Sequence, residues 1–214
     1  MKGITLLGYH SYRDFKLLLK SKEIGAAKVK TKKIDIEGAD GFLDLTDFFG
    51  GPKYENTVHK FQFSTLVAPS EFLTLFSDIK NKIHGRSGRV VLDDDPSYFY
   101  IGRCTVSSFT NEKNMGIVSV ECDCEPWKYK TERTTVTATV DGEDTIILTN
   151  SRKRAVPEVT IAAESTLRIT YQANIWDLGS GSYTLPELEL QAGENSVSVT
   201  GAGTISFTWQ EASQ

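Results

Sequence analysis

Short segments in which apolar and polar residues alternate make up most of this chain. Residues 118–125 are an example, with Val or Cys at each even position and Ser, Glu or Asp at each odd one. A period of two places alternate side chains on opposite faces of a β-strand, so such segments predict strands with one buried face. Other strands are expected at residues 28–36, 41–46, 60–65 and 98–106.

One segment follows a helical period instead. Between residues 70 and 84 the apolar positions are Phe72, Leu75, Phe76, Ile79 and Ile83. This spacing predicts an amphipathic helix, with Ser70 as its N-cap and Gly85 after its end. We expect the helix to cover one face of the first sheet, although the same stripe would also suit a partner protein.

Glycine-containing turns predict two hairpins. The first joins residues 28–36 to 41–46 through Glu37-Gly38-Ala39-Asp40 and forms a long arm. The second joins residues 134–140 to 145–149 through Asp141-Gly142.

Beyond Pro157 the strands become shorter and the turns more frequent. Strands are expected at residues 159–161, 166–172, 187–190, 195–200 and 204–209, with Gly201-Ala202-Gly203 as a hairpin turn. Five short strands at such intervals are typical of a small sandwich. We therefore expect a mainly β protein with two β-sandwich-type domains, at residues 1–133 and 134–214.

Charge is unevenly distributed along the 214 residues, whose formal net charge is −4. Residues 1–33 hold nine Lys or Arg against two acids, whereas residues 155–214 hold one base against seven acids. Lys28, Lys30 and Lys32 alternate along one expected strand and are candidate contacts between copies. A solvated, lysine-rich hairpin that discourages edge-to-edge aggregation is the interpretation we favour, although a basic end would also suit nucleic acid.

The sequence contains no recognisable catalytic or metal-binding constellation. Cys104, Cys122 and Cys124 include no pair spaced as zinc ligands, so we expect three core thiols without a disulfide, as suits a reducing cytoplasm. The run Asp93-Asp94-Asp95 precedes a proline and is expected to be a turn with solvated acids, although three carboxylates would also suit a divalent cation. No nucleophile elbow or phosphate-binding loop occurs, and no cofactor is expected. The apolar runs are also too short for a membrane helix.

The C-terminal part carries aromatic residues that favour either of two roles. Tyr171, Trp176 and Tyr183 would stack on sugars if they lay on an exposed face of the sandwich. If they are buried, they fill a small core instead. A carbohydrate-binding or adhesion module is therefore the alternative function for this domain.

Several motifs in order resemble one protein family. Residues 41–50 (GFLDLTDFFG) are followed by Tyr54-Glu55-Asn56-Thr57, the aromatic strand 61–63, the helix, and the stretches 88–96 and 98–103. Near the C-terminus, residues 185–195 and 206–209 complete the set. In this order the chain resembles the distal tail proteins, the Dit family of phages with long non-contractile tails.

The resemblance implies a non-enzymatic, structural protein of the virion tail tip, assembled in the host cytoplasm. Family members form a hexameric ring that joins the tail tube to the host-recognition apparatus, and their second domain is galectin-like. The implied partners are other copies of the chain, the major tail tube protein, the tail-associated hub or lysin protein, the tape measure protein and, in some relatives, receptor-binding proteins. DNA is implied only in transit through the ring.

Overall fold

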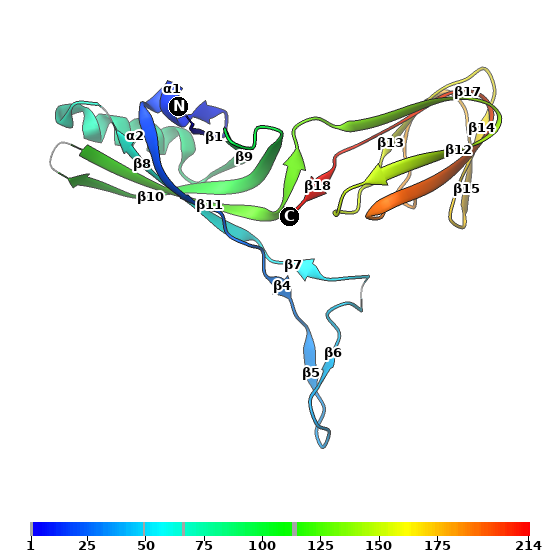
Figure 1. The fold of residues 1–214 in the computed structure, drawn as a ribbon, viewed down its shortest axis with the longest axis horizontal. Helices are drawn as coiled ribbons and strands as arrows, with labels where there is room; N and C mark the ends of the chain where they lie inside the picture. Colours follow the sequence, from blue (N-terminus) through cyan, green and yellow to red (C-terminus); the bar gives the residue numbers. More distant parts are fainter. Residues whose placement is uncertain (1, 49, 66, 113–114) are drawn as a thin grey trace. The chain divides into compact units, whose positions relative to one another are not determined.

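The computed structural model describes residues 2–48, 50–65, 67–112 and 115–214. The chain divides into two compact units, Met1–Lys128 together with Gln214, and Tyr129–Ser213, whereas the sequence placed the boundary at residues 133/134. The expected mainly β class, with sandwich-type domains and a helix on the first sheet, is confirmed (Figure 1). No helix among the described residues is long and apolar enough to cross a membrane.

The first unit is built on one antiparallel sheet. Its strand order is β2 (Tyr9–His10), β1 (Ile4–Leu6), β9 (Arg86–Leu92), β10 (Tyr98–Glu112), β11 (Met115–Lys130), β8 (Thr57–Thr65) and β3 (Leu17–Glu23). Strand β8 alternates strictly, so Phe61 and Phe63 are buried while Lys60 and Gln62 face outward. The period of two that predicted these strands thus places the core on one face of the sheet.

The predicted helix is present as α2 (Phe72–Ile83), which packs on β10 (Figure 1). Phe72, Ile79 and Ile83 are buried, so core packing accounts for the apolar stripe. The expected Ser70 cap is wrong: a 3-10 turn, η1 (Pro69–Glu71), leads into α2, and no side chain caps its first turn. At the other end Gly85, whose φ is 73°, follows the C-cap residue His84 just beyond the end of the helix, as expected.

The first 23 residues hold elements that the sequence patterns did not predict. Besides β1, β2 and β3 they include the short helix α1 (Ser11–Phe15), whose N-cap is His10. The His10 Nδ1 atom accepts hydrogen bonds from the amides of Tyr12 and Arg13, both at 3.2 Å. A histidine is outside the usual set of capping residues, so the sequence carries no recognisable start signal for this helix.

The predicted arm is present and longer than expected. Its strands are β4 (Val29–Lys30), β5 (Lys33–Asp35), β6 (Phe42–Asp44) and β7 (Lys53–Tyr54). Strand β4 pairs with β7 and β5 with β6, both antiparallel (Figure 1). The turn lies where the sequence placed it: Gly38 has a φ of 82°, and the amide of Ala39 donates to the carbonyl of Ile36 at 3.1 Å.

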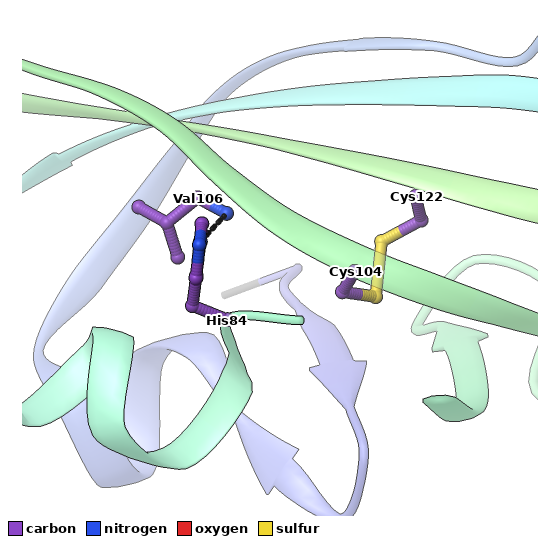
Figure 2. Close-up of a disulfide and its surroundings, with 4 residues drawn as sticks. All are labelled: His84, Cys104, Val106 and Cys122. Carbon is purple, nitrogen blue, oxygen red and sulfur yellow. Dashed lines mark hydrogen bonds between the residues drawn. A yellow bond between two sulfur atoms is a disulfide. The ribbon is translucent and has the colours of Figure 1, made fainter. Parts of the chain in front are cut away.

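The expectation of three free thiols is wrong for two of them. Cys104 on β10 and Cys122 on β11 form a disulfide, with their Cα atoms 4.1 Å apart (Figure 2). Neighbouring strands bring side chains on one face within bonding reach, which the spacing of cysteines along a single strand cannot reveal. Cys124 is free and buried as expected, and burial raises the pKa of its thiol to about 12.

The second unit is a six-stranded arrangement. Its order is β15 (Asn174–Leu178), β14 (Leu167–Tyr171), β17 (Gly193–Trp209), β13 (Glu158–Ala162) and β16 (Gly181–Thr184), with β12 (Thr134–Asn150) also paired to β17. The last strand of the described chain is the short β18 (Ala212–Ser213). The expected strand at residues 187–190 is wrong, because that segment makes only the single bridge between Leu190 and Ala155.

The predicted Asp141-Gly142 hairpin is also wrong. Strand β12 continues through this dipeptide and pairs with β17 in one register, from Thr134 opposite Trp209 to Asn150 opposite Gly193. Gly201-Ala202-Gly203 lies inside β17, so it is not a hairpin turn either. Gly142 and Gly201, which are register partners, have φ values of 100° and 135°. Each turn-like sequence is therefore a glycine-bearing irregularity at the middle of a long strand.

A buried carboxylate ties the start of the second unit to its end. Glu211 is 7% exposed, and its side chain accepts hydrogen bonds from Lys130 and Thr134. Burial alone would raise the pKa of Glu211, but these donors outweigh burial and hold the pKa below its ordinary value.

We predict that cysteine alkylation will distinguish the three thiols. With iodoacetamide, the native protein should gain no label because Cys124 is buried and its thiol is protonated at neutral pH. Denaturation without reductant should add one label, and denaturation with reductant should add all three, as read by intact mass. Three labels without reductant would contradict the disulfide.

We predict that Gly201→Ala destabilises the second unit by about 1–3 kcal/mol. An added Cβ would lie 2.6 Å from Leu167 Cδ2, on a backbone whose φ of 135° disfavours L side chains. Gly179→Ala is the matched control, because its Cβ meets nothing within 4 Å. Equal unfolding midpoints in urea for the two variants would contradict the argument.

We predict that Glu211→Gln lowers the stability of the second unit by about 1–3 kcal/mol at neutral pH, since a charged hydrogen-bond acceptor is lost. Because folding lowers the pKa of Glu211, its contribution to the free energy of unfolding is complete above the ordinary carboxyl pKa. That contribution is lost as pH falls through the pKa of the folded state, so the difference in stability between wild type and variant should disappear in acid. The exposed Glu164→Gln serves as control in the same urea titrations.

Candidate assembly surfaces

The arm, residues 28–48 and 50–55, is the most exposed part of the described chain. Every residue from Lys28 to Asp44 is exposed to solvent. It is stabilised by its own ladder, since the Leu45 amide donates to the Lys32 carbonyl at 2.8 Å and the Glu55 amide to the Lys28 carbonyl at 2.8 Å. A ribbon that buries so little of its own apolar surface presents nearly all of it to other molecules.

Charge along the arm is separated into two zones. The arm base, residues 28–33, contains four lysines and no acid, whereas the arm tip, residues 34–48, contains five acids and no base. None of Lys28, Lys30 and Lys32 forms an ion pair with a described carboxylate. The structure thus places the three predicted contact lysines together at the arm base, where they are available to another molecule.

The arm tip also exposes large apolar side chains that the sequence analysis did not single out. Phe42 is 67% exposed, and Ile34, Ile36 and Leu43 are each exposed by more than two fifths. Scattered exposed apolar residues are ordinary, but several on one short ribbon mark an interaction site. The sequence already indicated this exposure. Apolar and polar residues alternate along the hairpin strands, but the sequence predicts no element long enough to bury both faces of the arm.

The arm is anchored to the main sheet through a buried histidine. The Gly25 amide lies 3.2 Å from His59 Nδ1 on β8, which accepts its hydrogen bond. His59 is 1% exposed and makes an edge-to-face contact with the Tyr100 ring at 4.5 Å. Burial lowers the pKa of His59, so the imidazole stays neutral and keeps Nδ1 free to accept. The hydrogen bond between Gly25 and His59 therefore fixes the position of the chain where it enters the arm.

The acidic run at residues 93–95 forms three separate clamps and does not gather around a metal. Asp93 accepts from His10 Nε2 at 3.0 Å and from the Gly3 amide at 2.7 Å. Asp94 pairs with Lys22, and Asp95 pairs with Lys128 at 3.0 Å. The run lies in a turn as predicted, but its acids are paired where solvated acids were expected. Among the described residues no cluster of His, Cys, Asp and Glu is arranged to hold a metal ion.

The electrostatics of this run support the clamps. Burial alone would raise the pKa of Asp93, but the hydrogen bonds from His10 and Gly3 outweigh it and place the pKa below its ordinary value. The hydrogen bond from Lys22 likewise lowers the pKa of Asp94. All three carboxylates are therefore committed to holding the N-terminal segment and β11 to the β9–β10 turn.

A basic groove of about 430 Å³ lies between the β1–β2 turn, the end of α2 and the start of β9. Its lining residues are Leu7, Gly8, Tyr9, Lys82, Arg86, Ser87, Gly88 and Arg89. Lys82 is held by Asp78 at 2.8 Å, whose hydrogen bond raises the pKa of Lys82. Arg86 and Arg89 have no described carboxylate within ion-pairing distance. The groove is therefore suited to a negatively charged segment.

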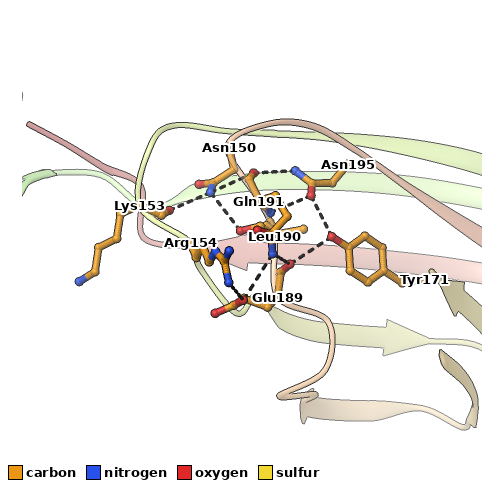
Figure 3. Close-up of polar contacts among 8 residues, drawn as sticks. All are labelled: Asn150, Lys153, Arg154, Tyr171, Glu189, Leu190, Gln191 and Asn195. Atoms are coloured by element: carbon orange, nitrogen blue, oxygen red, sulfur yellow. Dashed lines mark hydrogen bonds and ion pairs between the residues drawn. The ribbon is translucent and has the colours of Figure 1, made fainter. Parts of the chain in front are cut away.

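The three aromatic residues proposed for sugar stacking do not form one platform. Tyr171 is 3% exposed, and its hydroxyl lies 2.9 Å from Asn195 Oδ1 and 3.1 Å from the Glu189 carbonyl (Figure 3). Trp176 and Tyr183 are half-buried and pack against the core of the second unit. The structure therefore uses Tyr171 as a buried brace for the loop that contains Glu189.

Asparagine side chains complete this brace. Asn195 Nδ2 donates to the Gln191 carbonyl at 2.9 Å, and Asn150 Nδ2 donates to the Leu190 carbonyl at 3.4 Å (Figure 3). At the surface Arg154 pairs with Glu189 at 3.2 Å. These contacts satisfy backbone groups of an irregular segment and so explain how residues 186–192 are held without a strand ladder.

Comparison with known proteins gives a match by structure and none by sequence. No family model and no curated protein matches the chain. The crystal structure of SPP1 Dit (gp 19.1), described as a paradigm of the hub adsorption apparatus in phages that infect Gram-positive bacteria, is similar to it. The two share 14% sequence identity and a TM-score of 0.75, and the match covers 100% of each chain. The resemblance found in the sequence motifs is thus confirmed at the level of the fold, and this chain has the SPP1 Dit fold over its whole length.

Proposed function

We propose that this protein is a non-enzymatic structural component of a phage tail, located at the distal end of the tail in the virion. The observation that carries the proposal is the full-length match to SPP1 Dit, which includes both units and leaves no part of either chain uncovered. The ordered motifs in the sequence lead to the same family independently. A protein of this kind would assemble in the host cytoplasm.

In the proposed assembly the protein forms a hexameric ring that joins the tail tube to the host-recognition apparatus. The ring would contact the major tail tube protein on one side and the hub or lysin protein on the other. The tape measure protein and DNA would pass through the channel, and the second unit would be available to receptor-binding proteins. A closed ring requires head-to-tail interfaces in which two different surfaces of one subunit match.

The arm supports this proposal because it separates charge and exposes apolar residues on the same ribbon. Its lysine-rich base would face acidic surface on a neighbouring copy, and charge matching of this kind chiefly selects partner and orientation. Its unpaired strand edges could also extend a sheet across the interface.

The alternative function, a carbohydrate-binding or adhesion module in the second unit, finds less support. Its proposed contacts were Tyr171, Trp176 and Tyr183, but Tyr171 is buried within the core. A stacking platform needs aromatic faces in solvent. The structural role in the tail therefore remains the better account of the whole chain.

We predict that native mass spectrometry of the purified protein will detect a six-subunit species, and that negative-stain electron microscopy will show rings with a central channel. The physical reason is that matched head-to-tail surfaces form a closed ring when the rotation from one copy to the next is a whole fraction of a full turn. A strict monomer at every concentration tested would contradict the ring.

We predict that the triple variant Lys28→Glu, Lys30→Glu, Lys32→Glu weakens assembly by roughly tenfold or more, because charges that select the partner surface are reversed. Light scattering coupled to size exclusion measures the oligomer. The matched control reverses three exposed lysines outside the arm, Lys2, Lys20 and Lys60. An intact oligomer in the arm variant would show that the lysines are only a solvated face.

A further inference from the structure

The two most strongly charged features of the first unit are complementary. The arm tip has five acids and no base among residues 34–48, and the lining of the basic groove includes Lys82, Arg86 and Arg89. Both features also carry apolar surface, since Phe42 and Ile36 are exposed on the tip and Leu7 and Tyr9 line the groove. The match therefore includes both charge and hydrophobicity.

Apart from Lys82, which Asp78 holds, the charges that the argument uses on each side form no ion pair inside the described chain. Asp35, Glu37 and Asp40 form no ion pair with a described base, and Arg86 forms none with a described acid. The Arg89 guanidinium stacks on the Phe99 ring at 4.2 Å, which fixes its position while leaving its charge uncompensated. Unlike the acidic run at residues 93–95, which is held by His10, Lys22 and Lys128, these groups are available to a second molecule.

The arm tip is not seated in the groove of its own chain. Every residue from Ile34 to Asp44 is exposed, and the groove is open to solvent. Gly8 and Ser87 are among its lining residues, and a Cβ added at Gly8 would meet nothing within 4 Å, so a segment with bulky side chains can approach the backbone there. An occupant of the groove must therefore come from another copy or another protein, and the arm tip has the required chemistry.

We propose that the arm tip of one copy docks in the basic groove of a second copy, so that Asp35, Glu37 and Asp40 face Arg86, Arg89 and Lys82. The proposal rests on the proposed function in that it requires several copies to assemble. Tip and groove are different surfaces of one subunit, so the contact is head-to-tail and repeats from copy to copy. The apolar side chains of the tip, Phe42 foremost, supply buried area, and the charges set the orientation.

The test is cross-linking between two different cysteine variants that leave every charge in place. Ser87→Cys marks the groove and Ala39→Cys marks the arm tip, and both positions are exposed. The native cysteines are either buried or in the disulfide, so each variant has one accessible thiol. The two variants are mixed and treated with a short bis-maleimide. Because each copy has one accessible thiol, every cross-linked dimer joins two copies, either groove to tip or through two identical sites.

The expected result is a mixed Ser87→Cys with Ala39→Cys dimer, identified by peptide mass spectrometry, at roughly tenfold the yield of a control pair. The control replaces the groove variant by Thr74→Cys, an exposed position on α2 away from the groove. Adding Arg86→Glu to the groove variant should reduce the yield to the control level. Adding Glu37→Arg to the tip variant should then restore it, because the pair of charges is exchanged.

The outcomes separate this proposal from the proposed function. Six-subunit rings that show no groove-to-tip dimer above the control would overturn the docking contact and leave the ring proposal intact. A dimer that survives Arg86→Glu undiminished would overturn the electrostatic basis of the contact. Monomers throughout, with no cross-link in any mixture, would overturn both proposals.

Discussion

The register between β12 and β17 is the constraint on which the second unit depends. Because the two strands pair without interruption from Thr134 to Asn150, each inward position along β12 is fixed by the one before it. Val140, Ile146 and Leu148 are buried on the same face, and β13 and β14 attach to different halves of β17. A slip by one residue would expose this whole set, so the remaining strands of the unit are placed by this one pairing.

In the first unit the corresponding constraint is the pairing of the carboxylates in the turn between β9 and β10. Asp93, Asp94 and Asp95 each hold a different segment, and the first two have lowered pKa values because of the donors they face. A compact turn with three acids would repel itself if its charges were left unpaired. The run thus converts what would be a local source of strain into contacts with the N-terminal segment and β11.

Much of the fold follows from periodicity, and the failures have physical causes. The α2 stripe and the β8 and β11 alternations were predictable because each depends only on neighbours along the chain. The predicted Asp141-Gly142 hairpin was wrong because the dipeptide is only a local turn signal and carries no information on the register of the flanking residues. A two-residue hairpin there would place Glu143 beside Val140 and Thr145 beside Ala138, and it would put Ile146 on the opposite face from Val140. Parity along the strand, if it had been checked, would have excluded that hairpin.

The candidate surfaces were less predictable than the fold. Lys28, Lys30 and Lys32 were found as charged residues on a strand, and they do lie exposed on the arm. The basic groove was not found, because Leu7, Lys82 and Arg86 come from three segments that only the folded sheet brings together. The disulfide between Cys104 and Cys122 was not predicted for the same reason, since the spacing of cysteines along the sequence does not show which strands are neighbours.

The arm shows how solubility and association can be reconciled in one segment. Exposed Phe42 and Ile36 would promote indiscriminate association on a neutral ribbon, but the five acids on the same tip repel acidic surfaces and are costly to desolvate against neutral ones. Only a partner that neutralises those acids can then bury the apolar side chains, so charge restricts the choice of partner and apolar burial stabilises the contact afterwards. The formal net charge of −4 for the whole chain hides this arrangement, because the four lysines of the arm base nearly cancel the five acids of the tip.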